Sequence, residues 1–463
     1  MEANTRKRIW GWMAFDWATQ PFYTLGLTFI FGPYFADVAQ TLFLSEGLAP
    51  NEAKAKAQSV WSWGQMFAGL FIAFLAPIIG AYADSTGRRM PWLIFFSIIY
   101  AVSVWMLWYM SPDGAALWFC LFAFCIAFVA AEFALIFTNA LLPSLGTQDE
   151  IGKISGDGAA LGYWGGLLSL VIMLLFFFEL DEGRTILGNA PPFGLNGEAR
   201  EGTRAVGPFI TIWFVIFMIP YFLYVRDNAT PNRQGGLKSA INDLKTSLKN
   251  VVKRPSLFAF LGSSMLYRDA LNALYAFGGV YAVLVLDWTL IQIAIFGILG
   301  VVTAAIGTTV SGRYDRKLGP RPVITFHVLV LVLVSLTIVA TSRTSFYGIA
   351  LPQGSSIPDL TLYICGALIG SSGGGLYAAS RSMMVRHTHP ERPTEAFGLF
   401  ALSGKATAFL APMLIGLFTT VLQDARLGFA PVILLFLAGL FLLRWVEPEG
   451  DHQTWSKEAI PAP

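Results

Sequence analysis

Apolar runs long enough to cross a membrane recur along this 463-residue sequence. A bilayer has a hydrocarbon core about 30 Å thick, which an α-helix spans with about 20 apolar residues. Clear examples, several extended by flanking aromatic residues, are Ile72–Ala83, Leu93–Met110, Leu117–Phe137, Val323–Ala340 and Val432–Leu443. Only 13% of the residues are charged, against about one quarter in soluble domains. The sequence therefore excludes a soluble globular domain.

The polar breaks between these runs predict twelve membrane helices, which span 9–38, 59–83, 91–110, 115–141, 156–179, 206–225, 256–286, 288–311, 321–341, 359–385, 396–422 and 427–446. An even number places both termini on one side. With that side inside, 22 of the 31 Lys and Arg residues lie inside and 7 outside. The positive-inside rule therefore predicts cytoplasmic termini. Asp16 and the bulky aromatics of the first run predict a retained helix, not a signal peptide.

These helices predict an all-α membrane protein of twelve transmembrane helices in two six-helix pseudo-symmetric halves. The halves are residues 1–225 and 256–446, joined by a cytoplasmic linker at 226–255 and followed by a tail at 447–463. Within the linker, Leu237–Val252 has apolar residues at helical spacing with lysines between them. This pattern favours an amphipathic helix, which either lies on the membrane surface or only joins the halves.

One motif occurs once in each half, in the loop after the second and the eighth predicted helix. Each copy has an Asp, a Gly turn and basic residues where the helix ends. Small residues let helices approach closely, and an Asp can cap a neighbouring helix N-terminus. The residues concerned are Gly80, Asp84, Gly87, Arg88 and Arg89 in the first copy, and Asp315, Arg316 and Gly319 in the second.

The first copy resembles the major facilitator superfamily, whose loop between helices two and three reads Gly-x-x-x-Asp-x-x-Gly-Arg-Lys/Arg. The second copy departs from it, since Ser311 replaces the first Gly and Asp315 lies one residue farther from its Gly. The resemblance implies that Asp84 faces the start of helix eleven near Glu395–Gly398. It also implies that Asp315 faces helix five near Ser155–Gly158. Both acids would then be gate residues rather than substrate ligands.

A narrower resemblance covers more of the chain. Trp12–Ala18, Phe29–Ala36, Gly158–Gly166, Ala379–Ser382 and Glu395–Lys405 resemble the vacuole effluxer-like branch of that superfamily, also called "unknown major facilitator". Fungal members are associated with the release of amino acids from the vacuole. This resemblance implies a transporter fold and suggests an amino-acid-like solute.

Six charged residues fall inside the predicted helices, where each costs at least about 2.5 kcal/mol and so marks a candidate site. They are Asp16, Glu132, Arg268, Asp269, Arg381 and Lys405. The resemblance implies that helices one, four, seven and ten line a central cavity, and five of the six charges lie on them. Asp16, Glu132 and Asp269 are the candidates for proton coupling. Arg268 is expected to face Glu132 or Asp16 across the cavity, and Arg381, Glu395 and Lys405 are expected at the gate. The alternative is that these charges form structural ion pairs that contact no substrate.

Polar neighbours at helical spacing extend these charges into candidate substrate-binding faces. Gln20 and Tyr23 follow Asp16, and Asn272 and Tyr275 follow Arg268. The full set is Gln20, Tyr23, Asn139, Arg268, Asn272, Tyr275, Ser371 and Tyr377. The run Gly373–Gly375 on helix ten permits either local unwinding or close helix packing.

These residues predict a secondary active transporter that moves a zwitterionic solute across a bacterial inner membrane by alternating access, with protons as the coupling ion. No nucleotide-binding Gly-x-x-x-x-Gly-Lys-Ser/Thr loop, metal-ligand spacing or nucleophile–base pair occurs, so we expect no cofactor, no metal and no enzymatic activity. The expected partners are the solute, protons and membrane lipids, with no nucleic acid, and the chain is expected to be a monomer. The alternatives are an exporter of amphipathic compounds and a non-transporting sensor or assembly factor.

Overall fold

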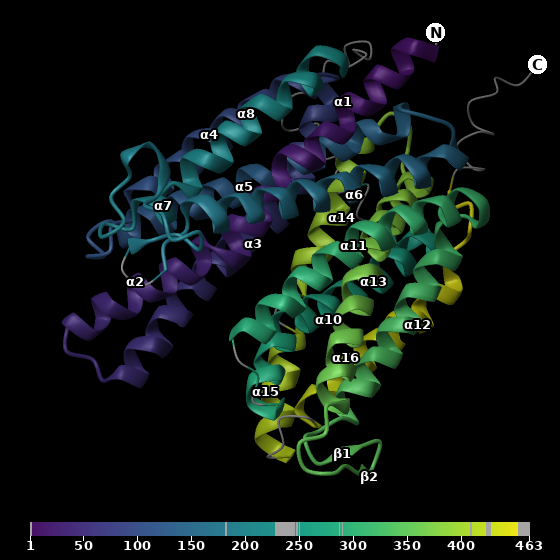
Figure 1. Cartoon of the computed structure of the whole chain (residues 1–463). Coiled ribbons are helices and arrows are strands. Elements are labelled where there is room, and N and C mark those ends of the chain that lie inside the picture. The colour runs from purple at the N-terminus through teal and green to yellow at the C-terminus, as the bar shows by residue number, and fades with distance from the viewer. Residues whose placement is uncertain are drawn as a thin grey trace, which may run out of the picture. The chain divides into compact units, whose positions relative to one another are not determined.

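The computed structural model describes residues 2–180, 183–226, 246, 249, 251–286, 288, 290–407, 410–422 and 427–451. The predicted amphipathic helix of the linker, Leu237–Val252, lies almost wholly outside these residues. The described chain forms helices and one short hairpin (Figure 1). Eleven helical stretches are long and apolar enough to cross a membrane. The 32-residue helix with Arg268 and Asp269 is the twelfth long stretch.

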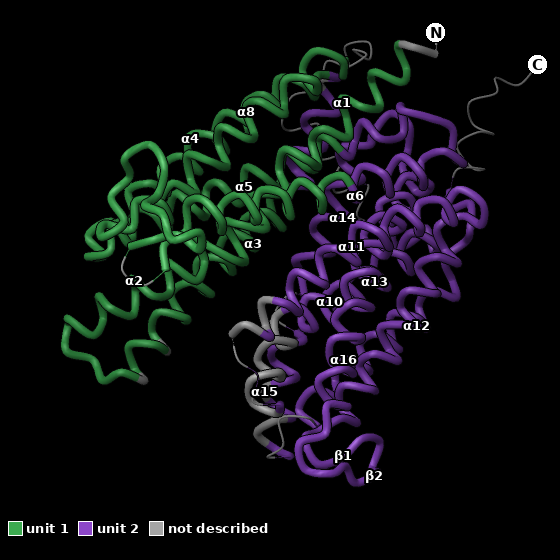
Figure 2. Tube along the Cα trace, viewed as in Figure 1, with its two compact units in different colours: residues 1–75, 88–138, 161–230 green, residues 76–87, 139–160, 231–463 purple. Residues whose placement is uncertain are grey.

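The chain divides into two compact units (Figure 2). Unit 1 comprises residues 1–75, 88–138 and 161–230, and unit 2 comprises 76–87, 139–160 and 231–463. Unit 2 therefore contains the second half of the sequence together with helix ends from the first half. This grouping matters for function, because the Asp of each motif copy belongs to unit 2.

The first half of the chain forms six long helical stretches. The elements are α1 (Glu2–Pro21), η1 (Phe22–Phe29), α2 (Phe31–Ser45), α3 (Pro50–Thr86), α4 (Met90–Trp105), η2 (Met106–Tyr109), α5 (Leu117–Leu141), η3 (Leu142–Ser144), α6 (Gln148–Ile172), η4 (Met173–Phe177), η6 (Pro192–Gly194), α7 (Glu201–Arg204) and α8 (Val206–Tyr224). Of these, α3, α5 and α6 run through both units. Aromatic rings fill the core of unit 1, where Phe124 stacks on Phe22 with ring centroids 5.4 Å apart and contacts Trp61 at 4.5 Å.

The second half forms the remaining stretches. The elements are α10 (Pro255–Leu286), α11 (Leu290–Leu318), α12 (Pro320–Val339), β1 (Ser345–Phe346), β2 (Ile349–Ala350), α13 (Ile357–His387), α14 (Pro393–Ala406), α15 (Leu410–Leu422), η7 (Leu427–Phe429), α16 (Ala430–Leu442) and η8 (Leu443–Trp445). Strands β1 and β2 pair antiparallel, with Ser345 opposite Ala350, in the connection between α12 and α13.

Two of the helices predicted as continuous are interrupted beside a proline. Pro21 has no N–H for the carbonyl of Trp17, and the chain becomes π-helical from Phe22. The indole N–H of Trp213 instead donates to that carbonyl at 3.1 Å. In the predicted helix 396–422, α14 ends at Ala406 and α15 begins at Leu410. A continuous helix there would press the ring of Pro412 against the carbonyl four residues earlier.

Candidate functional site

Glycines of α6 bring the first embedded acid, Asp16 on α1, into a tight helix crossing within unit 1. The Asp16 side chain is buried. A Cβ atom on Gly162 would lie 3.1 Å from the Asp16 carbonyl oxygen, and one on Gly165 would lie 2.9 Å from that of Trp17. The glycines of the motif Gly158–Gly166 therefore let the backbones of α1 and α6 come close together, which positions Asp16 against α6.

Of the residues in the predicted face, Asp16 and Gln20 lie on α1 and Tyr23 follows in η1. Gln20 lies on α1 and packs beside Gly166, where a Cβ would meet its Cγ at 2.8 Å. Tyr23 falls in the π-helical segment η1.

Arg268 on α10 lies against α14 within unit 2. Its guanidinium stands 4.5 Å from the ring centroid of Phe400 and donates to the Phe400 carbonyl at 3.1 Å. Gly404 lies beneath the same guanidinium, where a Cβ would meet Nη1 at 2.5 Å. Asn272 and Tyr275 follow on the exposed face of α10. Arg268 thus packs against α14, whereas the side chains of Asn272 and Tyr275 are exposed.

Two further embedded charges are neither fully buried nor fully exposed. Glu132 lies half-buried on α5, in unit 1. Lys405 lies half-buried in the last turn of α14, in unit 2. Glu132 stays a candidate for proton coupling and Lys405 a candidate gate residue, because a charge within a membrane helix is energetically costly.

Asp269 occupies a different environment from its neighbour Arg268, as their angular separation on a helix predicts. Its side chain is 3% exposed. Oδ2 accepts a hydrogen bond of 3.0 Å from the backbone N–H of Ala411, in the first turn of α15. Oδ1 has no hydrogen-bond partner among the residues that the structure describes. Asp269 therefore caps the helix that restarts after the interruption and keeps one carboxylate oxygen available.

The glycines of helix ten serve close packing, since α13 is one continuous helix from Ile357 to His387. A Cβ on Gly370 would lie 2.8 Å from the Thr303 hydroxyl, and one on Gly307 would lie 2.8 Å from the Ser371 Cα. Local unwinding, one of the two alternatives from the sequence, is therefore wrong. Ser371 packs against α11. On the other side of α13, the hydroxyl of Tyr275 lies where a Cβ of Gly373 would be.

Arg381 of α13 joins three helix ends within unit 2, and it is 1% exposed. Its Nε donates to the Ser155 hydroxyl at 2.8 Å, Nη2 to the Ser155 carbonyl at 2.6 Å, and Nη1 to Asn139 Oδ1 at 3.4 Å. The guanidinium also lies 5.3 Å from the ring centroid of Tyr377. Asn139 and Tyr377, predicted to bind substrate, thus contact this arginine, which ties α5 and α6 to α13.

The first motif copy forms a crossing between α3 and α14. A Cβ on Gly80 would lie 2.7 Å from the Thr394 carbonyl oxygen, so only glycine lets the helices meet there. One turn later, Asp84 Oδ2 accepts a hydrogen bond of 2.8 Å from the backbone N–H of Glu395. This is the position that the family resemblance implies for Asp84.

The second copy forms a matching crossing between α11 and α6, but its Asp is bonded differently. Gly156 and Gly312 meet back to back, with a Cβ on Gly156 falling 2.7 Å from the Gly312 Cα. Asp315 lies against Gly152, one turn before the expected Ser155–Gly158. Its Oδ1 accepts from the Ser382 hydroxyl at 3.3 Å, and Oδ2 has no hydrogen-bond partner among the described residues.

Local capping explains this difference. The residue that precedes α14 is Arg392, whose side chain does not cap the helix. Asp84 instead supplies the acceptor for the Glu395 N–H. At the start of α6, the Thr147 backbone N–H and hydroxyl donate to the Glu150 side chain at 3.0 and 3.1 Å, which is one half of a capping box. Asp315 therefore faces the first turns of helix five, one turn earlier than the expected Ser155–Gly158, and it accepts from Ser382 rather than from a helix N–H.

The remaining motif residues shape the two loops. Gly87 and Gly319 have φ values of +67° and +79°, which favour glycine. Arg88 and Arg316 are exposed, whereas Arg89 is buried. Among the described residues, no group of three or more His, Cys, Asp or Glu could hold a metal ion.

Some of these contacts lie outside the residues predicted from the sequence. The glycine pair Gly152 and Gly156 on α6 did carry a signal, because a spacing of four residues places both on one helix face and favours close packing of membrane helices. Thr147 and Glu150 carried one as well, because Thr-x-x-Glu is a sequence signature of a helix N-terminus. Ser382 carried none, because a serine does not indicate which distant helix lies beside it.

Solved transporters share this fold. The human organic anion transporter MFSD10 (TETRAN) superposes with a TM-score of 0.67 and 16% identity, covering 95% of this chain and 99% of that one. The proton:xylose symporter XylE gives 0.69 with 11% identity, covering 98% of each. Fold and comparisons together define a membrane transporter of the major facilitator superfamily, not an enzyme.

Within that superfamily, the chain belongs to the vacuole effluxer Atg22-like family, whose family model matches residues 4–454. It is 22% identical to the MFS-type transporter YxiO of Bacillus subtilis (strain 168), over 95% of this chain and 94% of that protein. It is 21% identical to Autophagy-related protein 22 of Cryptococcus neoformans var. neoformans serotype D (strain JEC21 / ATCC MYA-565), over 64% of this chain. The matched region spans half of that fungal protein.

Proposed function

We propose that this transporter moves a small zwitterionic solute, of the amino-acid class, by alternating access coupled to protons. One observation carries the proposal: helix ends of the first half are held in unit 2 by two glycine crossings and by polar bonds beside them. These bonds include Asp84 with the Glu395 N–H, and Arg381 with Ser155 and Asn139. Such contacts can be broken and remade as a gate.

The energy scale of these contacts suits a gate. A typical hydrogen bond contributes about 1 kcal/mol, and one that involves a charged group about 1.5–3 kcal/mol. Two conformations that differ by a few kcal/mol can each be populated and shifted by a bound solute. The backbone approach at Gly80 and at Gly156 fixes where the helices meet, and the side chains of Asp84 and Arg381 set the balance.

Proton coupling is proposed for Asp16, Glu132 and Asp269. An acid within a membrane helix is energetically costly, and such acids commonly mark proton or substrate pathways. Among them, Asp269 has the most specific support. Its Oδ2 caps α15, and Oδ1 is open to a proton. Arg268 supplies a positive group for a substrate carboxylate, with Asn272 and Tyr275 following it on the exposed face of α10.

The name of the family, vacuole effluxer, favours export of a small solute. The basic-residue asymmetry favours cytoplasmic termini, and the full-length similarity to a Bacillus protein favours the bacterial inner membrane. Export of amphipathic compounds is the second candidate, supported by the aromatic residues, which make up 14% of the chain.

Purified protein in detergent tests the substrate class first. A ligand that binds the folded state raises the melting temperature, so amino acids, dipeptides, betaines and cationic amphiphiles are compared. The proposal expects the amino acids or betaines to give the largest shifts, with loss of the shift in Arg268→Ala. Shifts from amphiphiles alone would support the second candidate.

A further inference from the structure

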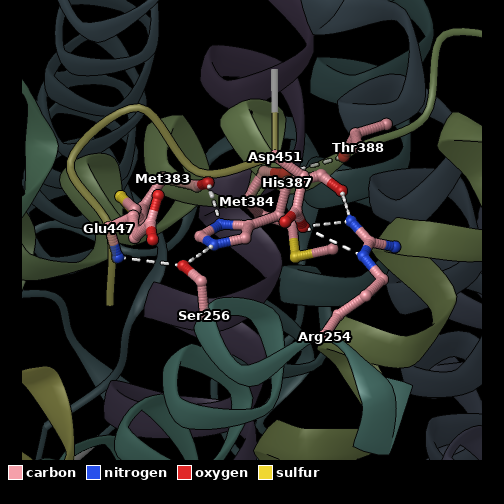
Figure 3. A network of polar contacts seen from close by, with 8 residues as sticks. All are labelled: Arg254, Ser256, Met383, Met384, His387, Thr388, Glu447 and Asp451. Atoms are coloured by element: carbon pink, nitrogen blue, oxygen red, sulfur yellow. Dashed lines mark hydrogen bonds and ion pairs between the residues drawn. The ribbon is translucent and has the colours of Figure 1, made fainter. Parts of the chain in front are cut away.

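The segment Val446–Asp451, here called the C-terminal strap, crosses the ends of α13 and α10 (Figure 3). Arg254, the residue before α10, anchors one side of it. Its Nε donates to Asp451 Oδ2 at 3.0 Å, and Nη2 pairs with the same oxygen. Nη2 also donates to the His387 carbonyl at 2.7 Å. One arginine thus ties the strap to the last residue of α13.

A directed chain of hydrogen bonds runs through His387, which is 1% exposed. Its Nδ1 lies 3.1 Å from the Met383 carbonyl, which can only accept, so Nδ1 carries the proton. Nε2 then accepts from the Ser256 hydroxyl at 2.8 Å. That hydroxyl accepts in turn from the backbone N–H of Glu447 at 2.9 Å. Strap, α10 and α13 therefore share one continuous network.

The strap also encloses the end of α13 from the other side. Arg386 Nη1 donates to the Pro448 carbonyl at 2.9 Å and pairs with Glu449 at 3.0 Å. The backbone N–H of Asp451 donates to the Arg386 carbonyl at 3.0 Å. Gly450 makes this approach feasible, since its φ is +57° and a Cβ there would lie 2.6 Å from that carbonyl oxygen.

The enclosed helix end is the one that carries the gate contacts. Arg381 and Ser382 lie about one turn before Arg386 on α13 and bond to Ser155 and Asp315. A helix end that is fixed on both sides presents these side chains in one position, whereas a frayed end presents several.

We infer that the C-terminal strap is a positioning element, which holds the end of α13 in register for the Arg381 and Ser382 contacts. This role rests on the proposed gate function of those contacts. The strap also connects the exit of the 226–255 linker, through Arg254, to that gate. Displacement of the strap by a cytoplasmic event would then loosen the gate from a distance.

Hydrogen–deuterium exchange of the full-length protein in nanodiscs tests this without any substrate. Asp451→Asn removes the ion pair with Arg254, and Asp451→Glu retains it. The inference expects Asp451→Asn to raise exchange about tenfold in peptides from 381–387 and from 148–160. The second peptide is decisive, since Ser155 bonds to Arg381 and not to the strap, so local fraying alone would leave it unchanged. Asp451→Glu is expected to restore near-native exchange.

A glycine pair provides the matched control. Gly450→Ala and Gly354→Ala both place a side chain on a left-handed backbone, with φ values of +57° and +77°. Gly354 has open space around it, so only Gly450→Ala displaces the strap. Faster exchange at 148–160 in Gly450→Ala alone supports the inference. Unchanged exchange there in both Asp451→Asn and Gly450→Ala overturns it, while the transport proposal is judged by its own ligand screen.

Discussion

The carboxylate of Asp84 accepts a 2.8 Å hydrogen bond from the backbone N–H of Glu395, a residue 311 positions away in the chain. That N–H belongs to the first turn of α14, where helices have donors without intrahelical partners. The acid therefore acts as a helix cap supplied by another helix. Because this cap joins two helices, its loss frees α3 from α14 as well as weakening α14.

Replacement of Asp84 by Asn keeps an acceptor for the Glu395 N–H but removes the negative charge at the start of α14, which is expected to weaken this crossing by about 0.3–1 kcal/mol, or up to about 2 kcal/mol where the charge is partly buried. The protein would then favour the inward-open state and turn over more slowly, with folding retained. Accessibility of a cysteine at the inner end to a maleimide measures the shift. Asp315→Asn is the control, with a smaller expected shift because that carboxylate accepts from the Ser382 hydroxyl and not from a helix N–H. Equal accessibility in wild type and Asp84→Asn would contradict the capping role.

Replacement of Gly80 by Ala is expected to separate α3 from α14, because the added Cβ falls 2.7 Å from the Thr394 carbonyl oxygen. Overpacking of this kind typically costs about 1–3 kcal/mol. Gly69→Ala on the same helix is the matched control, since nothing lies within 4 Å of its Cβ position. Thermal unfolding should show a lower melting temperature for Gly80→Ala only. A lower value for Gly69→Ala as well would point to a general effect on α3.

Replacement of Ser155 by Ala removes the hydroxyl that Arg381 Nε contacts at 2.8 Å and leaves a buried guanidinium N–H without that acceptor. The expected loss is about 1–3 kcal/mol. Ser169→Ala provides the comparison, since that buried hydroxyl bonds to the Gly166 carbonyl three residues earlier on the same helix. Increased labelling at the inner end should accompany Ser155→Ala and be absent in Ser169→Ala. If the two serine variants label alike, Arg381 does not lock the gate.

An impermeant thiol reagent, applied to intact and to permeabilised cells, tests both faces of the proposed topology. A cysteine at Glu198, which is exposed in the loop between α6 and α8, should react. A cysteine at Ser239, in the linker, should react only after the cells are permeabilised. The wild type supplies the background of its three native cysteines. Reaction at 239 in intact cells would reverse the orientation.

Much of the fold follows from the sequence because lipid imposes a length and an apolar character on each span. The motif likewise predicts the position of Asp84, since Gly80 and Asp84 lie on one face of α3. Helix interruptions are harder to predict. Pro21 and Pro412 both lie in apolar stretches, and proline is tolerated in membrane helices when other groups satisfy the freed carbonyls. Trp213 does so for Trp17, and its distance in sequence gives no hint of it.

The sequence predicts which residues belong to the candidate site better than it predicts which hydrogen bonds they make. The cost of a charge within a membrane identifies Arg381 as a candidate, but Ser155 as its partner depends on how α6 crosses α13. Asp315 illustrates the limit of a repeat. Its motif is similar to that of Asp84, yet its carboxylate accepts from the Ser382 hydroxyl, whereas that of Asp84 accepts from a helix N–H. The C-terminal strap has no sequence pattern beyond Gly450.

Proton coupling is the central claim, and Asp269 is the residue on which it is tested most directly. The measurement is flux of the best-binding amino acid in proteoliposomes, as net movement driven by a pH gradient and as exchange at equal pH. Asp269→Asn keeps an acceptor for the Ala411 N–H but cannot take up and release a proton. We predict that it abolishes gradient-driven flux and retains exchange. Gradient-driven flux equal to wild type in Asp269→Asn would contradict the account.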